Sequence, residues 1–151
     1  MFPFKKILVP TDFSEPSFCG LKMAGEMAKH FDTEILIVNV HKPIPKLPTP
    51  RVEASETTFD ISAYEKQIIA EAENNLVELG AEFLGDQIKP KVIVREGEAA
   101  HEILDVAAEE GVDAIIIATH GRTGLAKIVF GSVAQRVVRR AQCPVLTIRS
   151  C

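Results

Sequence analysis

Residues 115–135 read IIIATHGRTGLAKIVFGSVAQ, and this stretch indicates the fold because an apolar run gives way to small and polar residues before a helical pattern begins. The apolar run belongs to Asp113–Thr119, which is short enough to be a strand buried on both faces. Gly121 and Gly131 punctuate the connection, and Ser132 opens the helical segment. Glycine at such positions either turns the chain sharply or lets another group approach the backbone.

The same alternation of strand and helix runs along the whole chain. Apolar strands separated by helical segments predict a parallel sheet that is covered by helices on both faces, with right-handed crossovers. No second domain boundary interrupts the pattern, so we expect one domain over residues 1–151. We predict strands at Lys5–Pro10, Glu34–Val40, Pro90–Glu96, Asp113–Thr119 and Cys143–Ser150, and helices at Ser14–Phe31, Ile61–Leu84, Ala99–Glu110 and Ser132–Ala141.

One connection is unusually long and rich in proline. Residues 41–58 hold four prolines, and proline removes backbone donors, so neither a helix nor a strand is expected to run through them. A connection of this length inside a compact domain is typical of a lid, a binding loop or a disordered segment.

The composition is that of an ordinary globular domain. With 151 residues, 46% of them hydrophobic, the chain is large enough to be stable without disulfides. Its three cysteines are an odd number without a C-x-x-C pair, which argues against a disulfide framework or a zinc site. No stretch approaches the roughly 18 apolar residues of a membrane span. We therefore predict a cytoplasmic protein that has no membrane partner.

The charge is distributed unevenly along the chain. The net charge is −4, and tryptophan is absent, so a nucleic-acid partner is not expected. Residues 114–151 nevertheless carry +6, which leaves −10 for the rest. Such asymmetry is typical of an anion site. Alternatively, Arg136, Arg139 and Arg140 only complement the dipole of a helix C-terminus.

Two short segments are candidates for a phosphate or ligand site. Glycine before a helix N-terminus, as at Gly131 and Ser132, lets an anion reach backbone N–H groups. The alternative is a capping box in which Ser132 and Gln135 only satisfy those groups. Asp12 follows the first strand directly, where it either contacts a ligand or only supports a turn. The standard P-loop and G-x-G-x-x-G motifs are both absent from the sequence.

The chain resembles the universal stress proteins of the UspA type over nearly its whole length. The resemblance runs from ILVPTDFS through ILIVNV and GEAAHEIL to DAIIIATHGRTGLAKIVFGSVAQRVVRRAQCPVLTI. ATP-binding members of that family carry a G-2x-G-9x-G-[ST] motif. Gly121, Gly131 and Ser132 match this motif, and Ala118 stands in place of its first glycine.

The resemblance implies a flavodoxin-like, Rossmann-like α/β fold, with a doubly wound five-stranded parallel sheet of strand order 3-2-1-4-5. Adenosine would lie across the strand ends, with Asp12 and Val40 at the adenine and Ala118 and Gly121 at the ribose and phosphates. Backbone amides near Ser132 would bind the phosphate chain. The implied binding residues are Pro10, Thr11, Asp12, Val40, Ala118, His120, Gly121, Arg122, Gly131, Ser132 and Val133.

The resemblance also implies a function. We expect a protein that binds ATP, with Mg²⁺ or Mn²⁺ held through the phosphates and no protein ligand to the metal. It would act as a regulatory or protective protein in a stress response, without catalytic residues. Two alternatives remain, namely an interaction protein that binds no nucleotide and a slow adenine-nucleotide hydrolase. His120 is either a phosphate ligand or a solvated loop residue.

A homodimer is predicted from the last strand. In the implied strand order, Pro144–Ser150 lies at an edge of the sheet, where unpaired N–H and C=O groups favour pairing with a second copy. The alternative is a monomer whose edge is kept unpaired by Arg149 and by fraying of the terminus.

Overall fold

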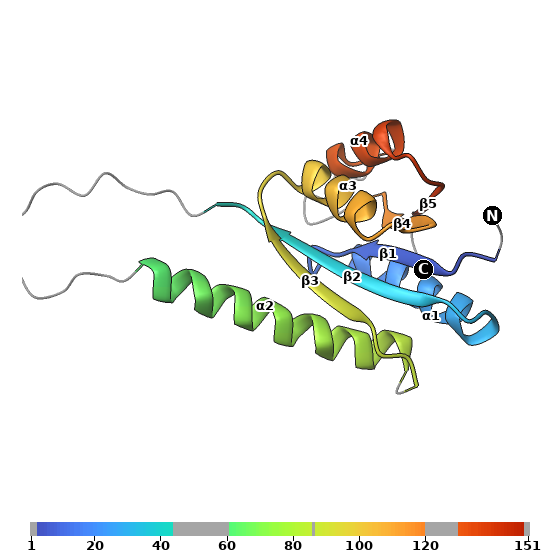
Figure 1. Cartoon of the computed structure of the whole chain (residues 1–151), viewed down its shortest axis with the longest axis horizontal. Helices are drawn as coiled ribbons and strands as arrows, with labels where there is room; N and C mark the ends of the chain where they lie inside the picture. Colours follow the sequence, from blue (N-terminus) through green and yellow to red (C-terminus); the bar gives the residue numbers. More distant parts are fainter. Residues whose placement is uncertain (1–2, 44–60, 86, 120–129, 150–151) are drawn as a thin grey trace, which may run out of the picture.

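The computed structural model describes residues 3–43, 61–85, 87–119 and 130–149. Its five strands form one sheet in the order β3-β2-β1-β4-β5, and every pairing is parallel, which confirms the expected fold (Figure 1). The strands are β1 (Lys6–Pro10), β2 (Glu34–His41), β3 (Lys91–Glu96), β4 (Ala114–Ala118) and β5 (Val145–Ile148), and the helices are α1 (Glu15–His30), α2 (Ile61–Leu84), α3 (Ala99–Glu109) and α4 (Ser132–Arg140).

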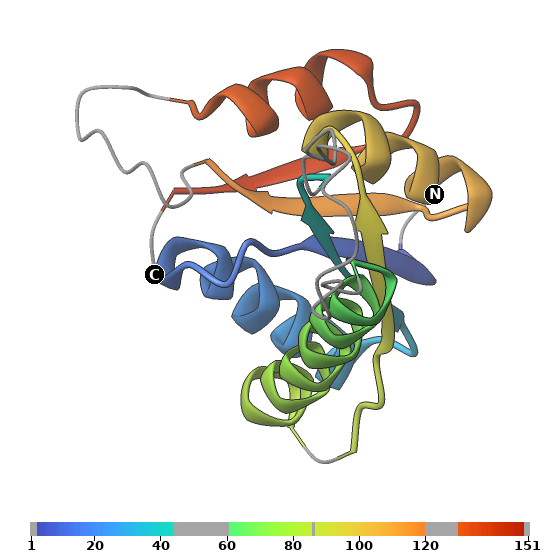
Figure 2. The same cartoon turned by 90° about the vertical axis from the view of Figure 1, so that its left-hand side faces the viewer.

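Helices cover both faces of the sheet. Figure 2 shows α1 and α2 on one side of the strands and α3 and α4 on the other. The sequence of β1 explains the two layers, because successive strand residues point to opposite faces. Ile7 and Val9 pack in the cluster that includes residues of α1 and α2. Leu8 packs in the cluster that includes residues of α3 and α4.

The central position of β1 accounts for its apolar sequence. β1 pairs with β2 on one side and with β4 on the other, where Leu8 is in register with Leu36 and Ile115. All three side chains are fully buried. Burial of each such side chain contributes about 1.5–3 kcal/mol to the stability of the fold relative to exposure. The packed centre of the sheet therefore holds the ends of these strands in place.

The bonding state of the cysteines differs in part from the expectation that the chain has no disulfide. Cys19 in α1 is disulfide-bonded, so the argument from the sequence against disulfides was wrong for this residue. Cys143 is a free thiol that packs at the border of the α3 and α4 cluster, and burial raises its pKa. Cys143 therefore packs as a small, partly buried residue beside this cluster.

Two further expectations concern membranes and the proline-rich connection. Among the described residues, no helix combines the length and the apolar character that crossing a membrane requires. β2 extends to His41 and so includes the first residue of the predicted loop 41–58, whereas residues 44–60 lie outside the described part of the chain.

Candidate functional site

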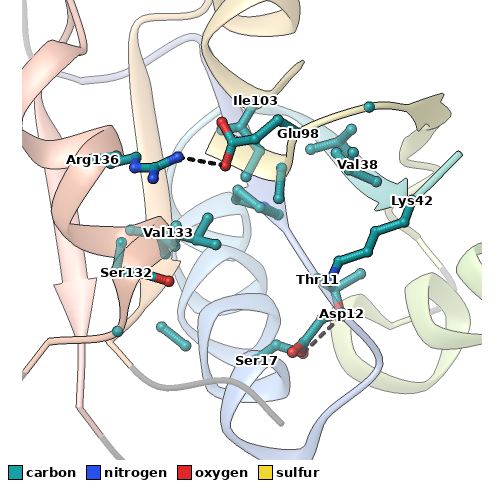
Figure 3. A pocket seen from close by; sticks show the side chains of 18 of the residues that line it. Thr11, Asp12, Ser17, Val38, Lys42, Glu98, Ile103, Ser132, Val133 and Arg136 are labelled. Carbon is teal, nitrogen blue, oxygen red and sulfur yellow. Dashed lines mark hydrogen bonds and ion pairs between the residues drawn. The ribbon is translucent and has the colours of Figure 1, made fainter. Parts of the chain in front are cut away.

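A cavity of about 1030 Å³ opens at the carboxyl ends of β1, β2 and β4, and the first residues of α3 and α4 close its other side (Figure 3). The chain runs from β1 outward to β2 and β3 in one direction, and β4 and β5 lie in the other direction. This is the point of a doubly wound sheet where ligands bind. Its volume is at the upper end of the ~300–1,000 Å³ that small-molecule pockets occupy.

The cavity brings together most of the residues that the sequence suggested. They come from β1 and the turn after it, from β2, from the end of β4 and from the start of α4. His120, Gly121 and Arg122 lie outside the described residues. The predicted residues that line the cavity are Pro10, Thr11, Asp12, Val40, Ala118, Gly131, Ser132 and Val133.

Thr11 forms part of the cavity wall and is held by a buried hydrogen-bond network. Its Oγ1 lies 2.7 Å from Oγ of Ser17, and its backbone carbonyl accepts a bond of 2.9 Å from Nδ2 of Asn39. All three residues are at most 7% exposed. Buried hydroxyl and amide groups need such partners, so this network fixes the end of β1 against α1 and β2.

Asp12 belongs to a tight turn and also lines the cavity. Ser14 donates its backbone N–H, at 3.1 Å, and its hydroxyl to Oδ1 of Asp12. Between them, Phe13 has φ 61°, the one positive φ of a non-glycine residue in the described part of the chain. Such a conformation costs on the order of 1–3 kcal/mol and recurs at ligand sites. Asp12 therefore supports the turn and also lines the cavity, and its contact with a ligand stays a prediction.

Ala118 fits where the family motif has glycine. It is the last residue of β4, it is 8% exposed, and it does not have a positive φ. The conformational reason for requiring glycine is thus absent at this position. The methyl group forms part of the cavity wall.

The N-terminus of α4 has no side-chain cap among the described residues. Gly131 is the N-cap, with φ −67° and ψ 155°, and Ser132 is the first helical residue. The capping box that Ser132 and Gln135 could have formed is therefore not seen. Gly131 donates its own N–H to the carbonyl of Thr119 at 2.6 Å. Gly131, Ser132 and Val133 all line the cavity, and the first amides of a helix have no partner within the helix.

The N-terminus of α3 differs because a carboxylate already occupies it. Glu98 is the N-cap, and its side chain accepts from the backbone N–H of Ala100 at 3.4 Å and of His101 at 3.1 Å. Both helix starts line the cavity. Because Glu98 satisfies the start of α3, the start of α4 is the better place for an exogenous anion.

Charged side chains at the cavity were in part missed from the sequence. Arg136 in α4 contacts Oε1 of Glu98 at 2.9 Å, and Lys42 lies at the end of β2. Glu98 follows β3 just as Asp12 follows β1, so the same rule could have found it. Arg136 is four residues after Ser132 and therefore shares its helix face.

The other basic and metal-binding candidates lie apart from the cavity. Arg139 and Arg140 are in the last turn of α4, where the helix dipole accounts for them. In the described part of the chain, His101, Glu102 and Asp105 form a group with metal-ligand spacing on the surface of α3. His101 Nδ1 lies 2.9 Å from Oδ2 of Asp105, which is an ordinary pair one helical turn apart.

Comparison with known proteins identifies relatives of this chain and of its fold. The chain is 35% identical over 146 residues to universal stress protein MJ0531 of Methanocaldococcus jannaschii, covering 97% of this chain and 82% of the relative. The solved structure of MJ0577 from the same organism has a TM-score of 0.74 at 30% identity and covers 97% of this chain and 96% of the other.

A third protein is more distant. The universal stress protein of Archaeoglobus fulgidus, solved in complex with dAMP, has a TM-score of 0.59 at 22% identity, with 99% of this chain and 100% of the other covered. A sequence model of the universal stress protein family matches residues 3–149. This chain therefore belongs to the universal stress protein family.

Proposed function

We propose that this protein binds ATP in the cavity at the strand ends. The observation that carries the proposal is the start of α4, where a glycine N-cap opens a helix that no side chain of the described residues caps, at the rim of a large cavity. The amides of Ser132 and Val133 and the helix dipole would bind the phosphates. Asp12 and Val40 also line the cavity and would contact the adenine.

A divalent cation would assist binding through the phosphates. One helix N-terminus supplies about half a positive charge, and the described cations that line the cavity are Lys42 and Arg136. A triphosphate carries more negative charge than these groups neutralise. We therefore propose that Mg²⁺ or Mn²⁺ accompanies ATP.

Family membership makes adenine nucleotides the first ligands to test. The Archaeoglobus fulgidus protein was solved with dAMP, and at 22% identity it supports only a common fold. The argument for this chain therefore rests on its own residues. The physiological role that we propose is regulatory or protective action by a cytoplasmic, single-domain protein in a stress response.

ATP binding is expected from calorimetry on nucleotide-free protein. ATP should bind with a dissociation constant below 1 mM, tighter with Mg²⁺ than with EDTA, and any nucleotide retained from expression should be released on denaturation and identified as an adenine nucleotide. Absence of binding at millimolar ATP would refute the proposal and favour an interaction protein that binds no nucleotide.

Turnover of bound ATP is expected to be negligible. Efficient phosphoryl transfer needs a base, a positioned water and charge stabilisation around the γ-phosphate. Asp12 lies near the proposed adenine end, and the carboxylate of Glu98 is engaged by Arg136 and by the start of α3. A phosphate-release assay should stay well below about 1 s⁻¹, the lower end of ordinary enzyme rates. An ordinary rate that His120→Ala removes would contradict this expectation.

We also propose a homodimer through the last strand, Pro144–Ser150. β5 lies at an edge of the sheet, next to β4 alone. Its residues Val145–Ile148 are all partly exposed, which is compatible with a strand that has one open edge. Ser150 lies outside the described residues. A two-fold axis would close the pairing without forming a fibre.

A further inference from the structure

Glu98 and Arg136 face each other at the rim of the cavity, and Figure 3 shows their side chains meeting between α3 and α4. The Nη1 atom of Arg136 lies 2.9 Å from Oε1 of Glu98. Both side chains are about half exposed, at 55% and 53%. The pair therefore joins the start of α3, which the Glu98 carboxylate caps, to α4, whose start no described side chain caps.

The two partners are not equally fixed. Glu98 is held by the start of α3, since its carboxylate accepts hydrogen bonds from the backbone N–H groups of Ala100 and His101. The side chain of Arg136 is half exposed at the cavity rim, and Glu98 is its one ion-pair partner among the described residues. Exposed ion pairs contribute little to stability, so separating this pair costs little. Arg136 is accordingly the partner that can move.

A nucleotide phosphate would compete with Glu98 for this guanidinium. Arg136 lies one helical turn after Ser132, on the face of α4 that lines the cavity. A phosphate offers several acceptor oxygens and more charge than a single carboxylate, and it matches the planar guanidinium bidentately. Glu98 opposes the exchange in two ways, since it holds Arg136 and also places a negative charge beside the incoming phosphates.

We propose that Arg136 leaves Glu98 and binds a phosphate of the nucleotide. This ion pair then sets the preference of the site for phosphorylated over unphosphorylated adenosine. The inference rests on the proposed nucleotide site. It assigns to Glu98 a specificity-determining role against phosphate, and it assigns to Arg136 a contact that forms when phosphate displaces the carboxylate.

The test compares ATP with adenosine by calorimetry on the native protein, Glu98→Gln, Arg136→Gln and the double variant. Glu98→Gln should bind ATP about fivefold more tightly, and Arg136→Gln about tenfold more weakly, with adenosine unchanged in both. In the double variant the gain from Glu98→Gln should shrink to less than about twofold, because most of it arises from releasing Arg136.

Two matched controls exclude a general charge effect. Arg139→Gln removes the same charge from α4 outside the cavity, and Glu78→Gln removes a carboxylate from the exposed side of α2. Both should leave the ratio of ATP to adenosine affinity within about twofold. Arg136→Gln leaves the α3 cap in place, so it remains informative even if Glu98→Gln lowers the melting temperature.

The outcomes separate this inference from the proposed function. If the native protein binds neither ATP nor adenosine, the proposed function fails and the inference fails with it. If both ligands bind but the ratio of their affinities is unchanged in Glu98→Gln and Arg136→Gln, the inference alone is overturned. If Glu98→Gln tightens ATP binding just as much when Arg136 is also replaced, Glu98 acts by charge repulsion alone. That result would also overturn the proposed displacement of Glu98 from Arg136 by phosphate.

Discussion

Gly131→Val is expected to abolish ATP binding, with affinity at least about 100-fold weaker, equivalent to about 2.8 kcal/mol. Gly131 is the N-cap of α4 and lines the cavity, and the proposed phosphate site needs a ligand to approach the amides that follow it. The two methyl groups of valine would occupy the space in front of the amides of Ser132 and Val133. A phosphate could then no longer approach them within hydrogen-bond distance.

The fold should tolerate this substitution. Gly131 has φ −67° and ψ 155°, a conformation open to every residue, and a valine amide can still donate to the carbonyl of Thr119. The cost at an N-cap is about 1 kcal/mol or less. Calorimetry measures the binding and thermal unfolding checks the fold. Gly131→Ala serves as the graded control and should weaken binding less. Normal ATP binding by the Gly131→Val protein would place the phosphates elsewhere and leave ATP binding itself intact.

Thr147→Pro is expected to convert the proposed dimer to monomer. Pro144 and Ile148 direct their carbonyls to β4, where they accept from Ile115 at 3.0 Å and Thr119 at 2.8 Å. Since backbone groups alternate along a strand, Thr147 directs its N–H to the open edge. Proline there removes one donor from each copy, which weakens the dimer by about 1–3 kcal/mol, or roughly 5–150-fold, before any clash of the ring is counted.

The matched control is one residue earlier. Leu146 directs its N–H to β4 by the same alternation, so Leu146→Pro should break the β4–β5 ladder and lower the melting temperature strongly. Thr147→Pro should unfold close to the native temperature and run as a monomer in light scattering at tens of micromolar. A native protein that is monomeric under these conditions would disprove the dimer. A persistent dimer in Thr147→Pro would move the interface to another surface.

The elements of this fold were readable from the sequence because burial imposes a local pattern. β1 and β4 are buried on both faces, so their residues form continuous apolar runs that end at polar or small residues. The edge strand β5 was predicted two residues too long at its start, because Cys143 and Pro144 precede its first paired residue. A residue of an edge strand has a neighbouring strand on one side only and is less buried. The apolar pattern of the sequence therefore marks the ends of an edge strand less clearly.

The same local logic found the residues that end strands or begin helices. Asp12 follows β1, and Gly131 and Ser132 begin α4, so sequence position alone placed them where a doubly wound sheet binds ligands. Local logic failed for Ser132 as a cap. A cap depends on the dihedral angles of single residues, and the letters S-x-x-Q do not state which residue takes the extended conformation.

The sequence by itself therefore determined the alternation of strands and helices, the apolar centre and the strand ends that could bear a site. The strand order came from the family resemblance. Only the tertiary structure brought Glu98 to Arg136 and capped α3, while no described side chain caps α4. The physical reason is one of range. Apolar periodicity records which face of an element is buried, whereas an ion pair between residues 38 positions apart depends on how two helices cross the same sheet.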